Sequence, residues 1–257
     1  MNIVQNILTK NDCYKAGRKI TVKGLMIHSV GCSQPNASVF LKNWNRSGLE
    51  ACVHAFIDGN TGTVYQTLPW NHRGWHGGGS SNNTHIGVEM CEPATIKYTG
   101  GASFKDLDPT KTKETVMRTY NAAVELFAFL CKEYNLNPLT DIVGHKEGHK
   151  LGIASNHGDP DHLWSKFGLS MDGFRKDVQA QMKKGGVTTP PKAEKPVSGA
   201  QRTSYMVNVP AETDVYSAPA VMQIKKKGIY TIVEEKNGYG KLKSGAGWIK
   251  LSDVKKV

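Results

Sequence analysis

The sequence has no apolar run approaching the roughly 20 residues that a bilayer-spanning helix needs, so we expect no stable membrane insertion. Residues Met1–Asp12 lack the basic segment and the following apolar segment of a secretory signal peptide. We therefore expect synthesis in the cytoplasm without a leader. The chain also lacks a Cys-x-x-Cys pair, and its five scattered cysteines predict reduced, buried thiols.

Acidic residues are scarce relative to basic ones. The 257 residues include 33 Lys or Arg and 22 Asp or Glu, which gives a formal net charge of +11. Such a charge attracts polyanions, namely nucleic acid, anionic lipid or a wall that carries teichoic acids, although it also fits generic solubility. No nucleic-acid-reading module and no basic-aromatic face is recognisable, so no nucleic-acid partner is predicted.

One segment divides the chain. Residues 184–202 hold three prolines and three glycines with almost nothing apolar to bury, which predicts an extended linker. It separates a domain at 1–183 from a small domain at 203–257.

The first domain alternates strand-like runs with helical periodicity, which predicts an α/β fold. Strands are expected at 24–29 and 86–90, and a hairpin at 52–57 and 63–68 around an Asp-Gly-Asn-Thr-Gly turn. Residues 36–46 and, more clearly, Pro109–Tyr134 read as helices, the latter with Asp108 as N-cap. Residues 203–257 read instead as short strands between Gly, Pro and Asn, which predicts a small all-β barrel.

The histidines suggest a metal site. Four His, two Asp and one Glu fall within 145–162. A catalytic zinc takes three protein ligands and leaves one position open. This stretch can supply two ligands, and His28, at the polar end of an apolar strand, can supply the third. The spacing His145-x-Glu147-x-His149 differs from the metalloprotease helix, in which Glu follows the first His directly, and Gly144 and Gly148 disfavour a helix there.

Four motifs in order carry a resemblance to a known family. They are Met-Ile-His28-Ser, Trp75-His-Gly-Gly-Gly, Ile-Gly-Val-Glu89, and Val-Gly-His145 with Asn-His157-Gly-Asp159-Pro. Together they resemble the zinc N-acetylmuramoyl-L-alanine amidases of the amidase-2 type, which include phage endolysins, autolysins and peptidoglycan recognition proteins. The resemblance implies a mixed central sheet flanked by helices.

Residue by residue, the resemblance implies zinc bound by His28, His145 and Asp159. It further implies Glu89 as general base and acid and His157 as the group that stabilises the tetrahedral oxyanion; His157 in place of Asp159 as third ligand is the alternative. Val53 stands where the phage-lysozyme branch has Tyr, and His157 where that branch has Lys, which favours the autolysin arrangement.

Other histidines divide into two groups. His54, His76 and Asn83 are expected to line the substrate groove, and the resemblance points to His76 and Asn83 among them. The structural reading is preferred for the remaining four histidines, which are His72, His85, His149 and His162.

Residues 205–257 resemble bacterial SH3-type wall-binding domains in the sequence segments around Tyr216, Tyr239 and Trp248. We therefore expect an amidase that cuts peptidoglycan between N-acetylmuramic acid and L-alanine. Without a leader it reads as a phage or prophage endolysin released through a holin, acting on the wall of a Gram-positive host, with clostridia among the candidates. A leaderless autolysin, a non-catalytic peptidoglycan-binding protein on the same fold and a zinc peptidase of the stem peptide are the alternatives.

Overall fold

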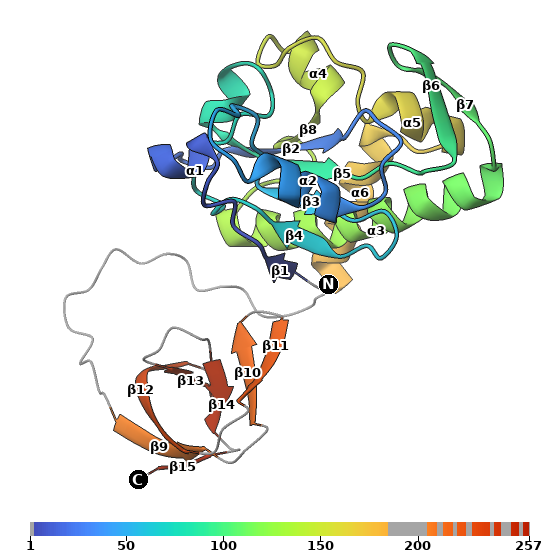
Figure 1. The fold of residues 1–257 in the computed structure, drawn as a ribbon. Helices are drawn as coiled ribbons and strands as arrows, with labels where there is room; N and C mark the ends of the chain where they lie inside the picture. The colour runs from blue at the N-terminus through green and yellow to red at the C-terminus, as the bar shows by residue number, and fades with distance from the viewer. Residues whose placement is uncertain are drawn as a thin grey trace. The chain divides into compact units, whose positions relative to one another are not determined.

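The computed structural model describes residues 3–184 and, further along the chain, seven short strand segments, which are 205–209, 213–217, 220–224, 228–236, 239–242, 248–251 and 254–256. The chain forms two compact units, Ile3–Thr188 and Thr189–Val257 (Figure 1). The expected linker at 184–202 lies outside the described residues apart from Lys184. Among the described residues, no helix combines the length and apolar character needed to cross a membrane.

A six-stranded sheet forms the centre of the first unit. The strand order is β1 (Ile3–Gln5), β4 (Val64–Gln66), β3 (Ala55–Ile57), β5 (His85–Met90), β2 (Gly24–Ser29) and β8 (Ile142–Gly144). Neighbouring strands run parallel except β3 and β4, which form the predicted antiparallel hairpin. The predicted strand at 24–29 is confirmed as β2, and it is buried along its whole length.

Helices cover both faces of this sheet, as the α/β prediction requires. Ala55 and Ile57 of β3 pack into one hydrophobic cluster with helix α3 (Pro109–Tyr134) and helix α6 (Met171–Lys184). Phe56, which points to the opposite face, packs with helix α2 (Ala37–Trp44). The alternation follows from the two-residue period of a strand, and it places one layer of helices on each side (Figure 1).

Helix α3 begins and ends as the sequence predicts. The side chain of Asp108 accepts a hydrogen bond from the Lys111 backbone N–H, and Pro109 occupies the first turn, where its missing N–H costs nothing. The helix ends at Asn135, which adopts the left-handed conformation.

Two other features were not predicted. Strands β6 (Ile96–Gly100) and β7 (Ser103–Asp106) form a separate antiparallel hairpin. Four of the five cysteines are buried as predicted, but Cys32 is exposed, because it lies in the loop that follows β2. The remaining short helices are α1 (Asp12–Ala16), α4 (His145–Lys150), α5 (Asp161–Trp164), η1 (Ser80–Asn83) and η2 (Ser165–Phe167).

The second unit contains a seven-stranded sheet in which every neighbouring pair is antiparallel. Its order is β11 (Ala220–Ile224), β10 (Thr213–Ser217), β14 (Trp248–Lys250), β13 (Tyr239–Leu242), β12 (Gly228–Lys236), β9 (Tyr205–Val209) and β15 (Lys255–Lys256). Ile232, Leu242 and Ile249 form its buried cluster. The all-β prediction is confirmed for the described strands, and the resemblance to SH3-type domains stays a prediction.

Candidate metal centre and pocket

Three adjacent parallel strands end at one edge of the sheet, and each brings a polar side chain there. His28 of β2 stands directly beside Glu89 of β5 in the strand register. Gly144, the last residue of β8, pairs with Ile27, so His145 follows at the same level. Open parallel sheets present ligands at the carboxyl ends of their strands, and residues more than a hundred positions apart meet here for that reason.

His28, His145 and Asp159 converge on one point. The Nδ1 atoms of the two histidines lie 3.0 Å apart, and Asp159 approaches them with Oδ2 at 3.2 Å from His28 Nδ1 and Oδ1 at 3.5 Å from His145 Nδ1. All three potential ligand atoms lie within 4.8 Å of one another. The side chain of His28 is 1% exposed and that of Asp159 13%.

The geometry and donor types of these three residues fit a zinc ion. Zinc binds imidazole nitrogen and carboxylate oxygen at about 2.0–2.2 Å, and a tetrahedral arrangement puts the ligand atoms about 3.3 Å apart. The two Nδ1 atoms, 3.0 Å apart, are close to that value, and each imidazole also has one Asp159 oxygen near it, Oδ2 at 3.2 Å from His28 and Oδ1 at 3.5 Å from His145. Two imidazoles and one carboxylate leave a fourth position for water or substrate. The cluster can therefore hold a metal.

Asp159 is ionised in this setting. Burial opposes its charge, but the hydrogen bonds with His145 and His28 outweigh burial and hold the pKa of this carboxyl well below its usual value. The backbone N–H of Ser29 adds a hydrogen bond of 3.4 Å to Oδ2. The same burial lowers the pKa of His28, so its ring favours the neutral form that a metal ligand needs.

Glu89 is the acidic group beside the cluster. It is half-buried, and its Oε2 is buried with no hydrogen-bond partner among the described residues. Burial, together with the negative charges of Asp159 and Glu92, raises its pKa well above the ordinary value. A carboxyl group with a raised pKa can take up a proton at neutral pH and release it again, which general acid–base chemistry requires.

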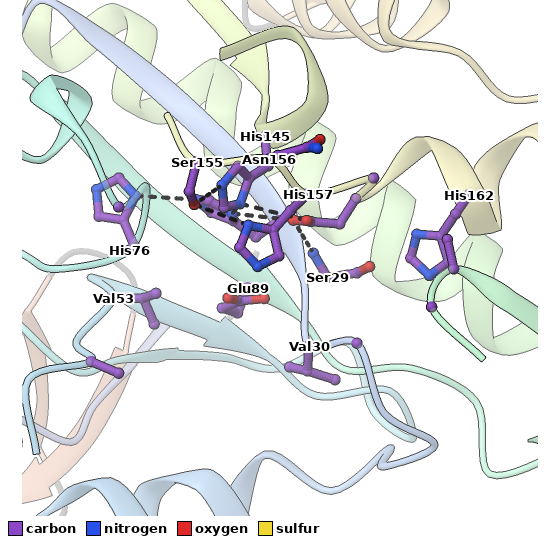
Figure 2. Close-up of a pocket in the computed structure, with 18 of the residues that line it drawn as sticks. Ser29, Val30, Val53, His76, Glu89, His145, Ser155, Asn156, His157 and His162 are labelled. Carbon is purple, nitrogen blue, oxygen red and sulfur yellow. Dashed lines mark hydrogen bonds and ion pairs between the residues drawn. The ribbon is translucent and has the colours of Figure 1, made fainter. Parts of the chain in front are cut away.

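His157 stands over the same pocket from the loop that precedes Asp159. Its ring centroid is 4.6 Å from that of His145, and its Nδ1 is 3.0 Å from the hydroxyl of Ser155. Glu89, His145, Ser155 and His157 all border the pocket in Figure 2. The described structure thus brings five of the expected residues together.

The three expected substrate residues are placed differently from one another. His54 is fully buried outside the pocket lining: its Nδ1 accepts from the Gly87 N–H at 3.0 Å and its Nε2 donates to the His72 carbonyl at 2.8 Å. Asn83 is also outside the lining, where it accepts a hydrogen bond from Arg73. Of the three, only His76 lines the pocket, where its Nδ1 lies 3.1 Å from His28 Nε2.

The pocket has a volume of about 650 Å³. One part of its wall is apolar and aromatic, from Trp44, Ala51, Val53 and Trp75. The other part comes from the unpredicted β6–β7 hairpin and helix α5, through Tyr98, Gly101, Ala102 and His162.

Sequence reasoning missed a buried cluster behind that second wall. Tyr98 donates a hydrogen bond of 2.7 Å to Glu92, which is fully buried, and its hydroxyl lies 2.6 Å from His162 Nε2. His162 had been read as a purely structural residue, yet it also lines the pocket. Two adjacent glycines at 100–101 are the local signal for the turn of this hairpin. The contact between Tyr98 and His162 joins residues 64 positions apart, and no sequence pattern indicated it.

The prediction that Gly144 and Gly148 disfavour a helix at His145 is wrong. Residues His145–Lys150 form helix α4, in which the Glu147 carboxylate accepts from the Gly144 N–H at 3.1 Å and pairs with Arg175. Gly148 packs closely in this helix, since a Cβ there would lie 2.7 Å from the terminal methyl of Met26 and 3.1 Å from the Cβ of Ala154. Glu147 is thereby committed to capping the helix, and the metalloprotease reading stays excluded.

Comparisons with known proteins agree with this geometry. The N-acetylmuramoyl-L-alanine amidase family profile matches residues 17–162, more than half of the chain. The N-acetylmuramoyl-L-alanine amidase XlyA of Bacillus subtilis strain 168 is 30% identical over 102 residues, which are 37% of this chain and 33% of that protein. The match therefore spans about a third of the length of this curated relative.

Two solved structures extend the comparison. The catalytic domain of XlyA aligns with 69% of this chain and 99% of that one at 24% identity and a TM-score of 0.48. The Staphylococcus aureus hydrolase AmiA, solved in complex with its ligand, aligns with 74% of this chain and 88% of its own at 20% identity and a TM-score of 0.52, which supports the mixed α/β fold. On the family match, this chain belongs to the N-acetylmuramoyl-L-alanine amidase family.

Proposed function

We propose that this protein is a zinc-dependent peptidoglycan amidase of the endolysin type. It would cleave the amide between N-acetylmuramic acid and L-alanine of the stem peptide. The observation that carries the proposal is the convergence of His28, His145 and Asp159 beside Glu89, at the edge of a pocket in a chain of this family.

In this proposal His28 and His145 through Nδ1 and Asp159 through a carboxylate oxygen hold the zinc ion. When bound, zinc lowers the pKa of water to about 7 and polarises the scissile carbonyl. Glu89 takes a proton from the attacking water and delivers it to the leaving amide nitrogen. The C–N bond breaks, the lactyl group of the sugar keeps a carboxylate, and L-alanine leaves with a free amine.

His157 is the proposed partner of the developing oxyanion. Its exposed ring borders the same pocket as Glu89 (Figure 2), so an N–H on Nε2 can donate to the carbonyl oxygen while Glu89 handles the proton. A donor preorganised toward that charge stabilises the transition state more than the substrate.

The second unit is proposed to bind the wall. Short antiparallel strands, a small apolar cluster and a surplus of basic residues suit an SH3-type domain that docks on a polyanionic polymer. Tethering would raise the local concentration of the first unit on an insoluble substrate without new contacts to it. Phage origin, holin-dependent release and a Gram-positive host complete the proposal.

Digestion of purified Gram-positive walls followed by mass spectrometry of the soluble products tests the activity. The amidase predicts glycan with free lactyl groups and stem peptides with a new L-alanine N-terminus. Glycan that still carries L-alanine would instead indicate a stem-peptide peptidase. Wall binding without any product, in the presence of zinc, would indicate a binding protein.

A further inference from the structure

His28 and His145 face each other and Asp159 through their Nδ1 atoms, so the Nε2 atom of each ring points away from Asp159. His28 Nε2 lies 3.1 Å from His76 Nδ1, and His145 Nε2 lies 3.1 Å from the hydroxyl oxygen of Ser155. A neutral imidazole that offers a lone pair from Nδ1 must carry its proton on Nε2, and that N–H needs an acceptor. His76 and Ser155 occupy the two acceptor positions.

The direction of the first hydrogen-bond chain is fixed at its far end. His76 Nε2 lies 3.1 Å from the backbone carbonyl of His85, and a carbonyl oxygen can only accept. His76 Nε2 therefore carries a proton. In the neutral ring, His76 Nδ1 is then an acceptor, which His28 can meet only by donating from Nε2. His28 Nδ1 is left with the lone pair that faces His145 and Asp159.

The second chain runs through one hydroxyl group. Ser155 Oγ accepts from His145 Nε2, and it can donate its single proton either to Gly77 O at 3.3 Å or to His157 Nδ1 at 3.0 Å. Gly77 O already accepts the backbone N–H of Ser155 at 2.8 Å. His157 Nδ1 is closer to the hydroxyl than Gly77 O is, so the Ser155 proton points to His157 Nδ1. The proton of neutral His157 then lies on Nε2, the nitrogen available to substrate.

Both acceptors are seated in space that only glycine provides. A Cβ on Gly87 would lie 2.3 Å from His76 Cγ, and a Cβ on Gly78 would lie 2.6 Å from Ser155 Oγ. The loop that carries His76 and Gly77 is held by buried Asn82, whose Oδ1 accepts both backbone N–H groups at 2.8 and 2.9 Å. These contacts hold His76 on its loop, and Ser155 packs against that loop from the segment after α4, where its backbone N–H donates to Gly77 O at 2.8 Å.

We propose that His76 and Ser155 are positioning residues: His76 fixes the tautomer of His28, and Ser155 fixes the tautomers of His145 and His157 together. The inference rests on the zinc function proposed above. In place of the expected substrate contact, His76 accepts a hydrogen bond from the metal ligand His28. Ser155, which the sequence did not single out, contacts both His145 and His157 and so links metal binding to oxyanion stabilisation.

Zinc affinity of the full chain, measured by competition with a chromogenic chelator, tests the role of His76. His76→Leu and His76→Asn have similar shapes, but only asparagine places an acceptor oxygen near the former Nδ1. We expect His76→Leu to weaken zinc binding about 10–100-fold, as loss of a residue that orients a ligand does, and His76→Asn to recover most of that loss. Equal affinities in the two variants would overturn the role of His76.

Ser155→Ala tests the second chain, with Ser81→Ala as its matched control. Ser81 is equally a serine beside the glycine loop, but its hydroxyl is buried without a hydrogen-bond partner among the described residues. We expect a 10–100-fold loss of zinc affinity for Ser155→Ala and none for Ser81→Ala. At saturating zinc, Ser155→Ala should lower kcat about tenfold with KM unchanged, because His157 loses its fixed tautomer. An unchanged affinity and kcat would contradict the role of Ser155.

Imidazole ¹⁵N spectra of the unaltered zinc-loaded chain test the same claim without any variant. We expect His28 and His145 to carry protons on Nε2. Protons on Nδ1 of either ring would overturn the inference. If the unaltered chain binds zinc and lyses walls while the variants match it, this inference fails and the proposed function stands. If the unaltered chain binds no zinc, both fail.

Discussion

The two units of the chain divide its chemistry and its charge between them. All nine histidines and all five cysteines lie between Cys13 and His162, and residues 189–257 contain neither type. Those 69 residues instead carry 12 Lys or Arg against six Asp or Glu. The first unit thus has the groups that hold metal and move protons, and the second has the denser positive charge, +6 in 69 residues against +5 in the other 188, which attracts a polyanion. This contrast teaches that turnover and attachment can be changed separately.

The largest expected effect comes from Asp159→Ala, which removes one of the three proposed metal ligands. We expect zinc binding to be lost and turnover of soluble muropeptide to fall at least about a thousandfold, since metal chemistry supplies several kcal/mol of transition-state stabilisation. Sedimentation with purified walls should be unaffected, because the second unit is unchanged. A variant that loses wall binding along with activity would break the division of roles.

Glu89→Gln separates proton transfer from metal binding within the first unit. We expect kcat to fall about 10²–10⁴-fold, the usual contribution of general acid–base catalysis. Zinc affinity should change little, because Glu89 is outside the ligand set. Single-turnover assays at saturating zinc measure the first quantity and chelator competition the second. Near-normal turnover in this variant would remove Glu89 from the mechanism.

The fully buried His54 predicts a pH dependence of stability confined to the first unit. Burial, opposed by hydrogen bonds to His72 and Gly87, lowers its pKa to about 4. The unfolded chain, with an ordinary histidine pKa near 6.5, therefore binds more protons between those values. The free energy of unfolding should fall as pH drops from 6.5 to 4, by about 3 kcal/mol from this residue alone.

Denaturant titrations of the metal-free chain at pH 7 and pH 4.5 check this. The comparison is between the unaltered chain and His54→Gln. The neighbouring His76 and His28 are present in both proteins, so their titration does not contribute to the difference. The variant should be less stable at pH 7 and show a smaller loss on acidification. Exposed His149→Gln serves as the control. Identical pH slopes for His54→Gln and the unaltered chain would contradict the prediction.

Ile249→Asp gives the smallest of these effects, and only on solid substrate. Ile249 is fully buried in the small cluster of the second unit, so an aspartate there should unfold that unit. We expect lysis of intact walls at low enzyme concentration to fall about tenfold or more through loss of tethering, with turnover of soluble muropeptide unchanged. A drop in soluble turnover would show that the units depend on each other.

The sequence predicted what depends on local pattern and missed what depends on contact. The apolar run of β2 and the capped helix α3 match the structure because period, N-cap and first-turn proline are local signals. Helix α4 was missed because Gly144 and Gly148 were given too much weight against the local cap from Glu147, and because the contacts of Glu147 with Arg175 and of Gly148 with Met26 are long-range.

The candidate site divides in the same way. His28, His145 and Asp159 could be named from the family motifs that contain them, and the structure brings the three side chains together. Ser155 could not, because serine is common in loops and its role depends on two rings that meet at its hydroxyl. His54 carries the same family signal as His76, and only burial distinguishes a structural imidazole from one next to a ligand.

Diffraction at the zinc absorption edge, on crystals of the zinc-loaded chain, tests the central claim most directly. We expect one strong anomalous peak within about 2.0–2.2 Å of His28 Nδ1, His145 Nδ1 and a carboxylate oxygen of Asp159, with Glu89 nearby and unbound. A peak that His157 holds in place of Asp159, or no peak at this edge of the sheet, would contradict it.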